Sequence, residues 1–222
     1  MKKYLTILTA IAISLGVAAQ TNSNPYKEQM ALNKTTQKVR MEKVGKDAKK
    51  DAKKYTKQGW KAMPGKLPLA KQLDKAYSMQ VELSESGENK YIYGIGMSTA
   101  NSTAAAQMAA ATAAREDIAS TMGVSLTTLI DDRKQQNQLS ALEASTIDEI
   151  AQKGKQVFCQ DMGKTETVIE AYRVLPNNNF EVMIGITYSA AEARKQMSRT
   201  VKRAFDEKNL QTASLDEKMG WK

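Results

Sequence analysis

The side chains that most often carry out catalysis are scarce in this chain. Its 222 residues include no histidine and a single cysteine, Cys159, which excludes Ser–His and Cys–His nucleophile pairs and most zinc sites. Neighbouring residues on a helix point about 100° apart, so adjacent carboxylates do not form a paired acid–base site. We therefore expect no catalytic residues, no metal ligands and no cofactor, and a protein that is not an enzyme. The adjacent acidic pairs are Glu116–Asp117, Asp131–Asp132 and Asp148–Glu149.

Positive charge is concentrated in one segment. The formal net charge is +9. Residues 20–60 contain eleven Lys/Arg and four Asp/Glu, whereas residues 61–222 contain twenty of each sign. Apolar residues recur in this segment every three or four positions, which predicts a basic amphipathic helical arm over residues 20–60. The lysines between the apolar positions are Lys43, Lys46, Lys49, Lys50, Lys53, Lys54 and Lys57.

The first nineteen residues have the layout of a secretory signal peptide. Lys2 and Lys3 precede an apolar run over residues 4–17, which is followed by Ala18, Ala19 and a polar stretch. The run is too short to span a membrane, which favours cleavage after Ala19 over a membrane anchor; a buried N-terminal helix is the alternative. We expect an exported protein, periplasmic or associated with the outer membrane, with no transmembrane segment after signal removal.

The arm can serve two roles. Its narrow apolar stripe can rest on the body of the protein or on another copy, with the lysines in solvent. Alternatively, the lysines can contact an anionic surface, such as lipid headgroups or an acidic cell-envelope polymer. Alanine dominates the stripe, so deep insertion into a bilayer is not expected. Nucleic acid is not an expected partner of an exported protein.

Prolines and glycines in residues 59–68 mark the end of the arm, and Trp60 is expected to pack into the body. Residues 61–90 are predicted to form a linker and a short helix over residues 69–83. Residues 91–209 are predicted to form a core domain that ends in a helix, and residues 210–222 a tail in which Trp221 indicates docking.

The core domain is predicted to be α+β, with a small antiparallel sheet. Residues 91–98 alternate as a strand with Gly94 and Gly96 on one face, and an alanine-rich helix follows from Ala104. A further helix over residues 141–161 precedes a β-hairpin formed by residues 165–175 and 180–188, and a last helix covers residues 190–209. We expect the glycine face to meet the alanine face. The inward positions of the alanine-rich helix are predicted to be Ala104, Met108, Ala111, Arg115, Ile118, Met122, Leu126 and Leu129.

Arg115 is the one charged residue on that predicted inward face. Three outcomes fit it: its guanidinium extends to solvent, pairs with a carboxylate, or contacts a ligand. Cys159 lies beside the apolar stripe of the following helix and is expected to act as a small, partly buried hydrophobe, with an intermolecular disulfide or a reactive thiol as the alternative.

The order of elements resembles the Lpp-twenty lipoprotein family and the N-terminal domain of the flagellar assembly protein FlgT, over about residues 91–188. The resemblance implies a dodecin-like core, in which one antiparallel sheet wraps around a helix, and a non-enzymatic, exported, envelope-associated protein. This chain lacks the family's lipid-acceptor cysteine and adds the basic arm. The arm and the Gly-Trp segment also resemble those of exported bacterial proteins. The residues that carry the family resemblance are Gly94–Gly96, Ala104–Ala114, Ala114–Ala119 and Phe180–Ile184.

These features predict a non-enzymatic cell-envelope protein that acts by assembly or by surface interaction. Self-association is expected because a small sheet with exposed edges can pair with another copy. The alternative is a small-molecule or lipid-binding domain that uses a cleft between the sheet and the long helix. An enzyme of unknown type is the third hypothesis.

Overall fold

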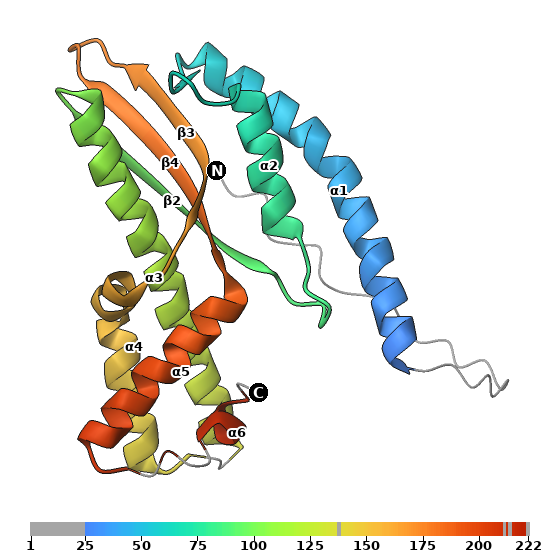
Figure 1. Cartoon of the computed structure of the whole chain (residues 1–222), viewed down its shortest axis with the longest axis vertical. Helices are drawn as coiled ribbons and strands as arrows, with labels where there is room; N and C mark the ends of the chain where they lie inside the picture. Colours follow the sequence, from blue (N-terminus) through green and yellow to red (C-terminus); the bar gives the residue numbers. More distant parts are fainter. Residues whose placement is uncertain (1–24, 137–138, 211, 213–214, 221–222) are drawn as a thin grey trace, which may run out of the picture.

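The computed structural model describes residues 25–136, 139–210, 212 and 215–220. The predicted signal peptide (residues 1–19) and Trp221 lie outside the described residues. The fold is α+β, as predicted: a four-stranded antiparallel sheet has helices on both faces (Figure 1). No helix among the described residues is long and apolar enough to cross a membrane.

The sheet has the strand order β1-β3-β4-β2. Strands β3 (Glu166–Val174) and β4 (Phe180–Ser189) form the predicted hairpin, whose turn places Asn178 at a φ of 62°. Strand β2 (Tyr91–Ala100) pairs with β4 along its whole length. Strand β1 (Lys61–Ala62) pairs with β3 and was not predicted, because two residues are too few to show an alternating pattern.

Helix α3 (Thr103–Gln135) covers one face of the sheet and is in direct backbone contact with β2. A Cβ atom at Gly96 would lie closer than 3.0 Å to the Ala110 carbonyl oxygen and the Ala114 amide nitrogen. A Cβ atom at Gly94 would approach the Ala114 carbonyl oxygen equally closely. The predicted meeting of glycine and alanine faces is therefore confirmed, and only residues without a side chain allow this approach.

The predicted inward face of this helix is wrong over its first half. Met108 is 74% exposed and Ala104 is also exposed, whereas one row of buried positions repeats every four residues. The apolar pattern could not distinguish one alanine from another. Buried alanines of α3 lie against Gly94 and Gly96 of β2. This row consists of Ala106, Ala110, Ala114, Ile118, Met122, Leu126 and Ile130, and Ala119 beside it is also buried.

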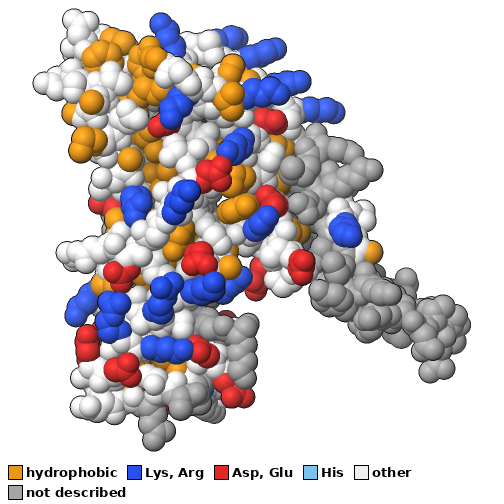
Figure 2. All heavy atoms as spheres, in the orientation of Figure 1, with side chains coloured by type: hydrophobic (Ala, Val, Ile, Leu, Met, Phe, Trp, Pro, Cys, Tyr) orange, Lys and Arg blue, Asp and Glu red, His pale blue; other side chains and the backbone are white. Residues whose placement is uncertain are grey.

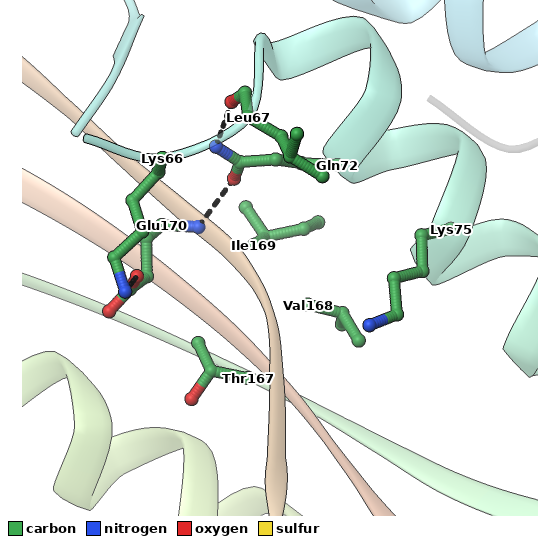
Figure 3. Close-up of a pocket in the computed structure, with 8 residues that line it drawn as sticks. All are labelled: Lys66, Leu67, Gln72, Lys75, Thr167, Val168, Ile169 and Glu170. Atoms are coloured by element: carbon green, nitrogen blue, oxygen red, sulfur yellow. Dashed lines mark hydrogen bonds and ion pairs between the residues drawn. The ribbon is translucent and has the colours of Figure 1, made fainter. Parts of the chain in front are cut away.

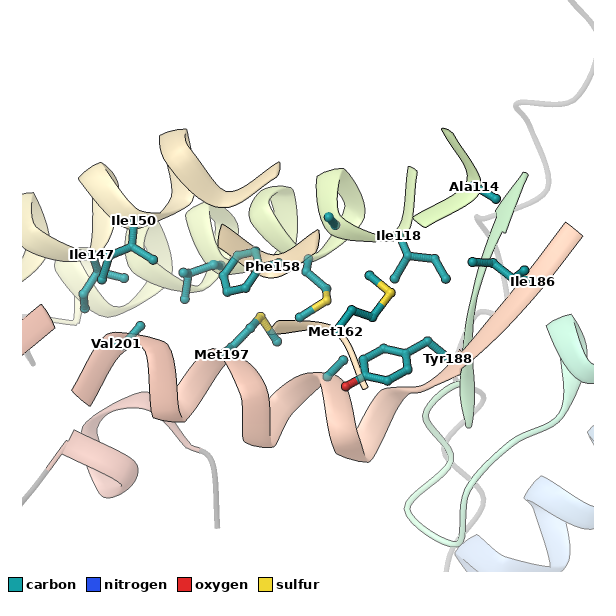
Figure 4. Close-up of a cluster of buried hydrophobic side chains, with 14 of the residues drawn as sticks. Ala114, Ile118, Ile147, Ile150, Phe158, Met162, Ile186, Tyr188, Met197 and Val201 are labelled. Carbon is teal, nitrogen blue, oxygen red and sulfur yellow. The ribbon is translucent and has the colours of Figure 1, made fainter. Parts of the chain in front are cut away.

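The second half of α3 packs against two further helices, away from the sheet (Figure 4). Helix α4 (Ala141–Asp161) begins with a capping box between Ser140 and Glu143. Helix α5 (Ala190–Glu207) follows β4 directly. Short helix α6 (Leu215–Met219) buries both of its terminal residues against this group, so the predicted tail contains a docked helix. The shared core includes Ile118, Ile147, Phe158, Met197, Val201 and Phe205.

Helices α1 (Pro25–Lys57) and α2 (Leu69–Val81) lie on the opposite face of the sheet. Helix α2 packs on β3, and α1 packs on α2 as an outer layer (Figure 1). Trp60, at the end of α1, is 3% exposed within this second core, as predicted. The predicted basic arm is therefore a helix whose last part, from Val44 onward, packs on the folded body.

Candidate functional site

The lysines of the predicted arm form one continuous solvent-facing surface on α1. Taking Ala48 as the centre of the buried stripe, they occupy about 140° of the opposite side, at about 100° per residue. Among the described residues, no ion pair involves any of these α1 lysines whose side chain is described. The side chain of Lys43 lies outside the described residues. The other six, here called the lysine face, are Lys46, Lys49, Lys50, Lys53, Lys54 and Lys57, all exposed.

The direction of the lysine face is fixed by the packing of α1 on α2. Val44, Ala48 and Ala52 are 7%, 0% and 6% exposed, so the predicted stripe rests on the body of the protein. Tyr77 of α2 donates a hydrogen bond to the Asp51 carboxylate (3.0 Å). Burial and this carboxylate raise the pKa of the Tyr77 hydroxyl, which keeps the phenol protonated and the bond formed.

Figure 2 shows a run of Lys and Arg side chains along the upper right of the molecule. Figure 1 places the end of α1 at the same position. Lys46 and Lys57 are eleven residues apart, or about 16 Å along a helix. A row of fixed cations of this length can attract an extended anionic partner.

Arg115 lies at the junction of α3 and the end of α4. Its Nη2 atom donates to the carbonyl oxygen of Met162, the C-cap residue of α4, at 2.7 Å. A cation at a helix C-terminus compensates the exposed carbonyl dipoles. The guanidinium therefore joins two elements of the core, and the prediction of a ligand contact at Arg115 stays untested.

The described acidic residues do not gather into a metal site. No cluster of three or more metal-ligating side chains occurs within the described part of the chain. Asp117 accepts a hydrogen bond from the backbone of β2, and Glu149 pairs with Lys208 at 3.0 Å. Cys159 is a free, partly buried residue packed against the main core, as expected for a small hydrophobe.

A small pocket opens between the start of α2 and β3 (Figure 3). The buried Gln72 amide fills its inner side: Nε2 donates to the Leu67 carbonyl (2.6 Å), and Oε1 accepts from the Glu170 amide (2.7 Å). Lys66 pairs with Glu170 and Lys75 with Glu166, each at 2.5 Å. The hydrogen bond from Glu170 to Gln72 and the ion pair of Lys75 with Glu166 hold α2 on β3.

Both edges of the sheet carry features that oppose strand pairing. Strand β1 is only two residues long, and in β2 the Ile95 amide donates to the Asp117 carboxylate at 3.0 Å. Short edge strands and charged groups at an edge are features that hinder pairing with another chain. Sequence reasoning missed the role of Asp117, since nothing in the local pattern indicates a partner 22 residues earlier.

The chain was also compared with known proteins. No protein-family model, no curated protein and no solved structure matches it.

Proposed function

We propose that this protein is a non-enzymatic binding protein that contacts an anionic surface through the lysine face of α1. The observation that carries the proposal is the arrangement of the six lysines. They lie opposite a buried stripe, and no carboxylate among the described ion pairs neutralises them. A fixed row of unneutralised cations on a helix favours binding of negative charge.

Two further observations support surface contact over the alternatives. Edge strand β1 is only two residues long, and one backbone amide of edge strand β2 is bound by Asp117; both features hinder assembly by strand pairing. Backbone contact between β2 and α3 at Gly94 and Gly96 leaves no room for a ligand between them there. Export and an envelope location, which depend on residues 1–19, stay predictions.

The test removes charge without disturbing the fold. Lys46, Lys50, Lys53 and Lys57 are changed to Gln. The arm itself is kept, because its deletion would expose the apolar surface of α2. Each lysine near an anionic surface contributes about 1 kcal/mol, so the change weakens binding about a hundredfold or more at low salt. Binding to phosphatidylglycerol vesicles is measured by co-sedimentation, and binding to dextran sulfate by surface plasmon resonance.

A matched variant removes the same charge elsewhere. It changes Lys153, Lys164, Lys195 and Lys208, which are exposed residues of the body, to Gln. We expect this control to bind nearly as well as the native protein, and native binding to fall steeply as salt is added. Equal losses in the two variants, or native binding by the α1 variant, would refute the proposal.

A further inference from the structure

One end of the sheet brings together segments that are distant in the sequence. Strand β2 ends at Ala100, which pairs with Phe180 at the start of β4, and Phe180 also pairs with Val174 at the end of β3. The end of α1 lies beside them, since the Gln58 carbonyl accepts a hydrogen bond from Arg173 at 3.3 Å. We call this region, with the first two turns of α3 and the loop before α2, the hairpin end.

Large apolar side chains are exposed at the hairpin end. Four of the eight exposed large hydrophobic residues of the described chain are here: Leu67, Met97, Met108 and Val174, at 61%, 50%, 74% and 55% exposure. Figure 2 shows apolar side chains beside Lys and Arg side chains at the upper end of the molecule, where Figure 1 places the hairpin and the end of α1. Exposed apolar groups gathered with charged ones are a feature of interaction sites.

The same region is free of acidic residues. Residues 52–73, 91–115 and 171–180 contain no Asp or Glu, while residues 52–73 contain six lysines. Among the carboxylates that adjoin these ranges, the two on strands β3 and β4 are paired, Glu170 with Lys66 and Glu181 with Arg173, each at 2.5 Å. The hairpin end therefore combines exposed apolar groups with positive charge, without the negative charge that would repel an anionic partner.

We infer that the anionic surface is a lipid bilayer, which the hairpin end enters while the lysine face contacts its headgroups. This inference rests on the proposed function and specifies its partner. A polyanion in water offers no apolar phase for Met97, Met108 and Val174, whereas the acyl-chain boundary of a bilayer does. Met97 pairs with Met183 on the α2 side of the sheet, and Met108 belongs to α3 on the other side. Apolar groups on both sides indicate that the sheet meets the bilayer end-on.

The experiment compares two probes with one triple variant. Met97→Ser, Met108→Ser and Val174→Thr are combined, and the control is Val124→Thr with Leu142→Ser, at positions 65% and 56% exposed outside the hairpin end. All five residues are exposed, and circular dichroism checks the fold of both variants. We expect the triple variant to bind phosphatidylcholine–phosphatidylglycerol vesicles about tenfold to a hundredfold more weakly, with unchanged binding to dextran sulfate. The control keeps native binding to both probes.

The outcomes separate this inference from the proposed function. If the triple variant binds the vesicles as the native protein does, the bilayer inference is overturned, and loss of dextran sulfate binding by the α1 lysine variant still supports the proposed function. If the lysine variant binds both probes like the native protein, the proposed function fails. Native vesicle binding should fall as salt is added but leave residual binding at high salt that the triple variant lacks, because salt screens only the charge contribution. Absence of any such residual binding would count against the inference.

Discussion

The contact between β2 and α3 can be tested by adding one methyl group at Gly96. In Gly96→Ala, the new Cβ atom would overlap the Ala110 carbonyl oxygen and the Ala114 amide nitrogen, which are backbone atoms of α3. Backbone atoms cannot turn aside as a flexible side chain can, so the helix and the strand must separate. The separation loosens the buried contacts of Ala110 and Ala114 on both sides of the new methyl group.

The expected cost follows from overpacking in a core. Extra methyl groups in a well-packed interior cost about 1–3 kcal/mol, and we expect about 3 kcal/mol because the overlap is with backbone. For a chain of this size, each kcal/mol lowers Tm by about 2–4 °C. Gly96→Ala should therefore lower Tm by about 6–12 °C.

The measurement is thermal unfolding followed by circular dichroism, with Gly163→Ala as the matched control. Gly163 is exposed, and its added Cβ would have only the Tyr188 hydroxyl nearby, at 3.8 Å. We expect the control to melt within about 2 °C of the native protein, because a small change at an exposed site is worth only about 0.5 kcal/mol. A Gly96→Ala variant as stable as this control would refute the close approach of β2 and α3.

Two further predictions concern the packing of the helices. Partial burial raises the pKa of the Glu143 carboxyl, but hydrogen bonds from Lys218 and Ser140 outweigh it and set the pKa below its ordinary value of 4.5. The ionised carboxylate therefore stabilises the fold above that value. The stability difference between native protein and Glu143→Gln in urea unfolding should shrink as pH falls below about 4.5, and a constant difference would contradict this. Trp60→Ala should cost about 3–5 kcal/mol in urea unfolding, because Trp60 is buried and its ring faces Arg173 at 4.9 Å; a loss under about 1 kcal/mol would show that α1 is not anchored there.

The close approach of the glycines of β2 and the alanines of α3 could be predicted from the sequence, but the alanines that face inward could not. Two glycines on one face of a strand, followed by a run of alanines, predict a close approach, since both residue types lack bulk. The run offers alanine at every position from Ala104 to Ala106 and from Ala109 to Ala111. The inward positions are therefore set by where Gly94 and Gly96 lie on the sheet, which is a tertiary fact. From Ile118 onward the prediction was correct for Ile118, Met122 and Leu126, whereas Leu129 is only partly buried and its neighbour Ile130 is the buried residue.

The candidate site was predictable in composition but not in orientation. The charge count located the lysines, and the spacing of Val44, Ala48 and Ala52 located the stripe. The sequence left open whether this stripe rests on the body or on another copy, because an alanine stripe fits many apolar partners. The hairpin end was not predicted at all. Its residues come from separate segments, and the absence of Asp and Glu becomes informative only when the strand pairing joins them.

The packing of α1 on α2 lowers the entropy cost of binding a surface through the lysines of α1. Lysines on an unfolded tail must lose backbone freedom when they line up on a surface, at about 1–2 kcal/mol per residue that becomes ordered. Here that ordering is completed by folding, because Ala48 and Ala52 fix α1 on α2, and the hydrogen bond from Tyr77 to Asp51 adds a polar contact at the same junction. The remaining cost of binding is the side-chain freedom of the lysines. A rigid layer whose lysines face solvent, next to an acid-free apolar end, is therefore better suited to a surface than to a partner that must be enclosed.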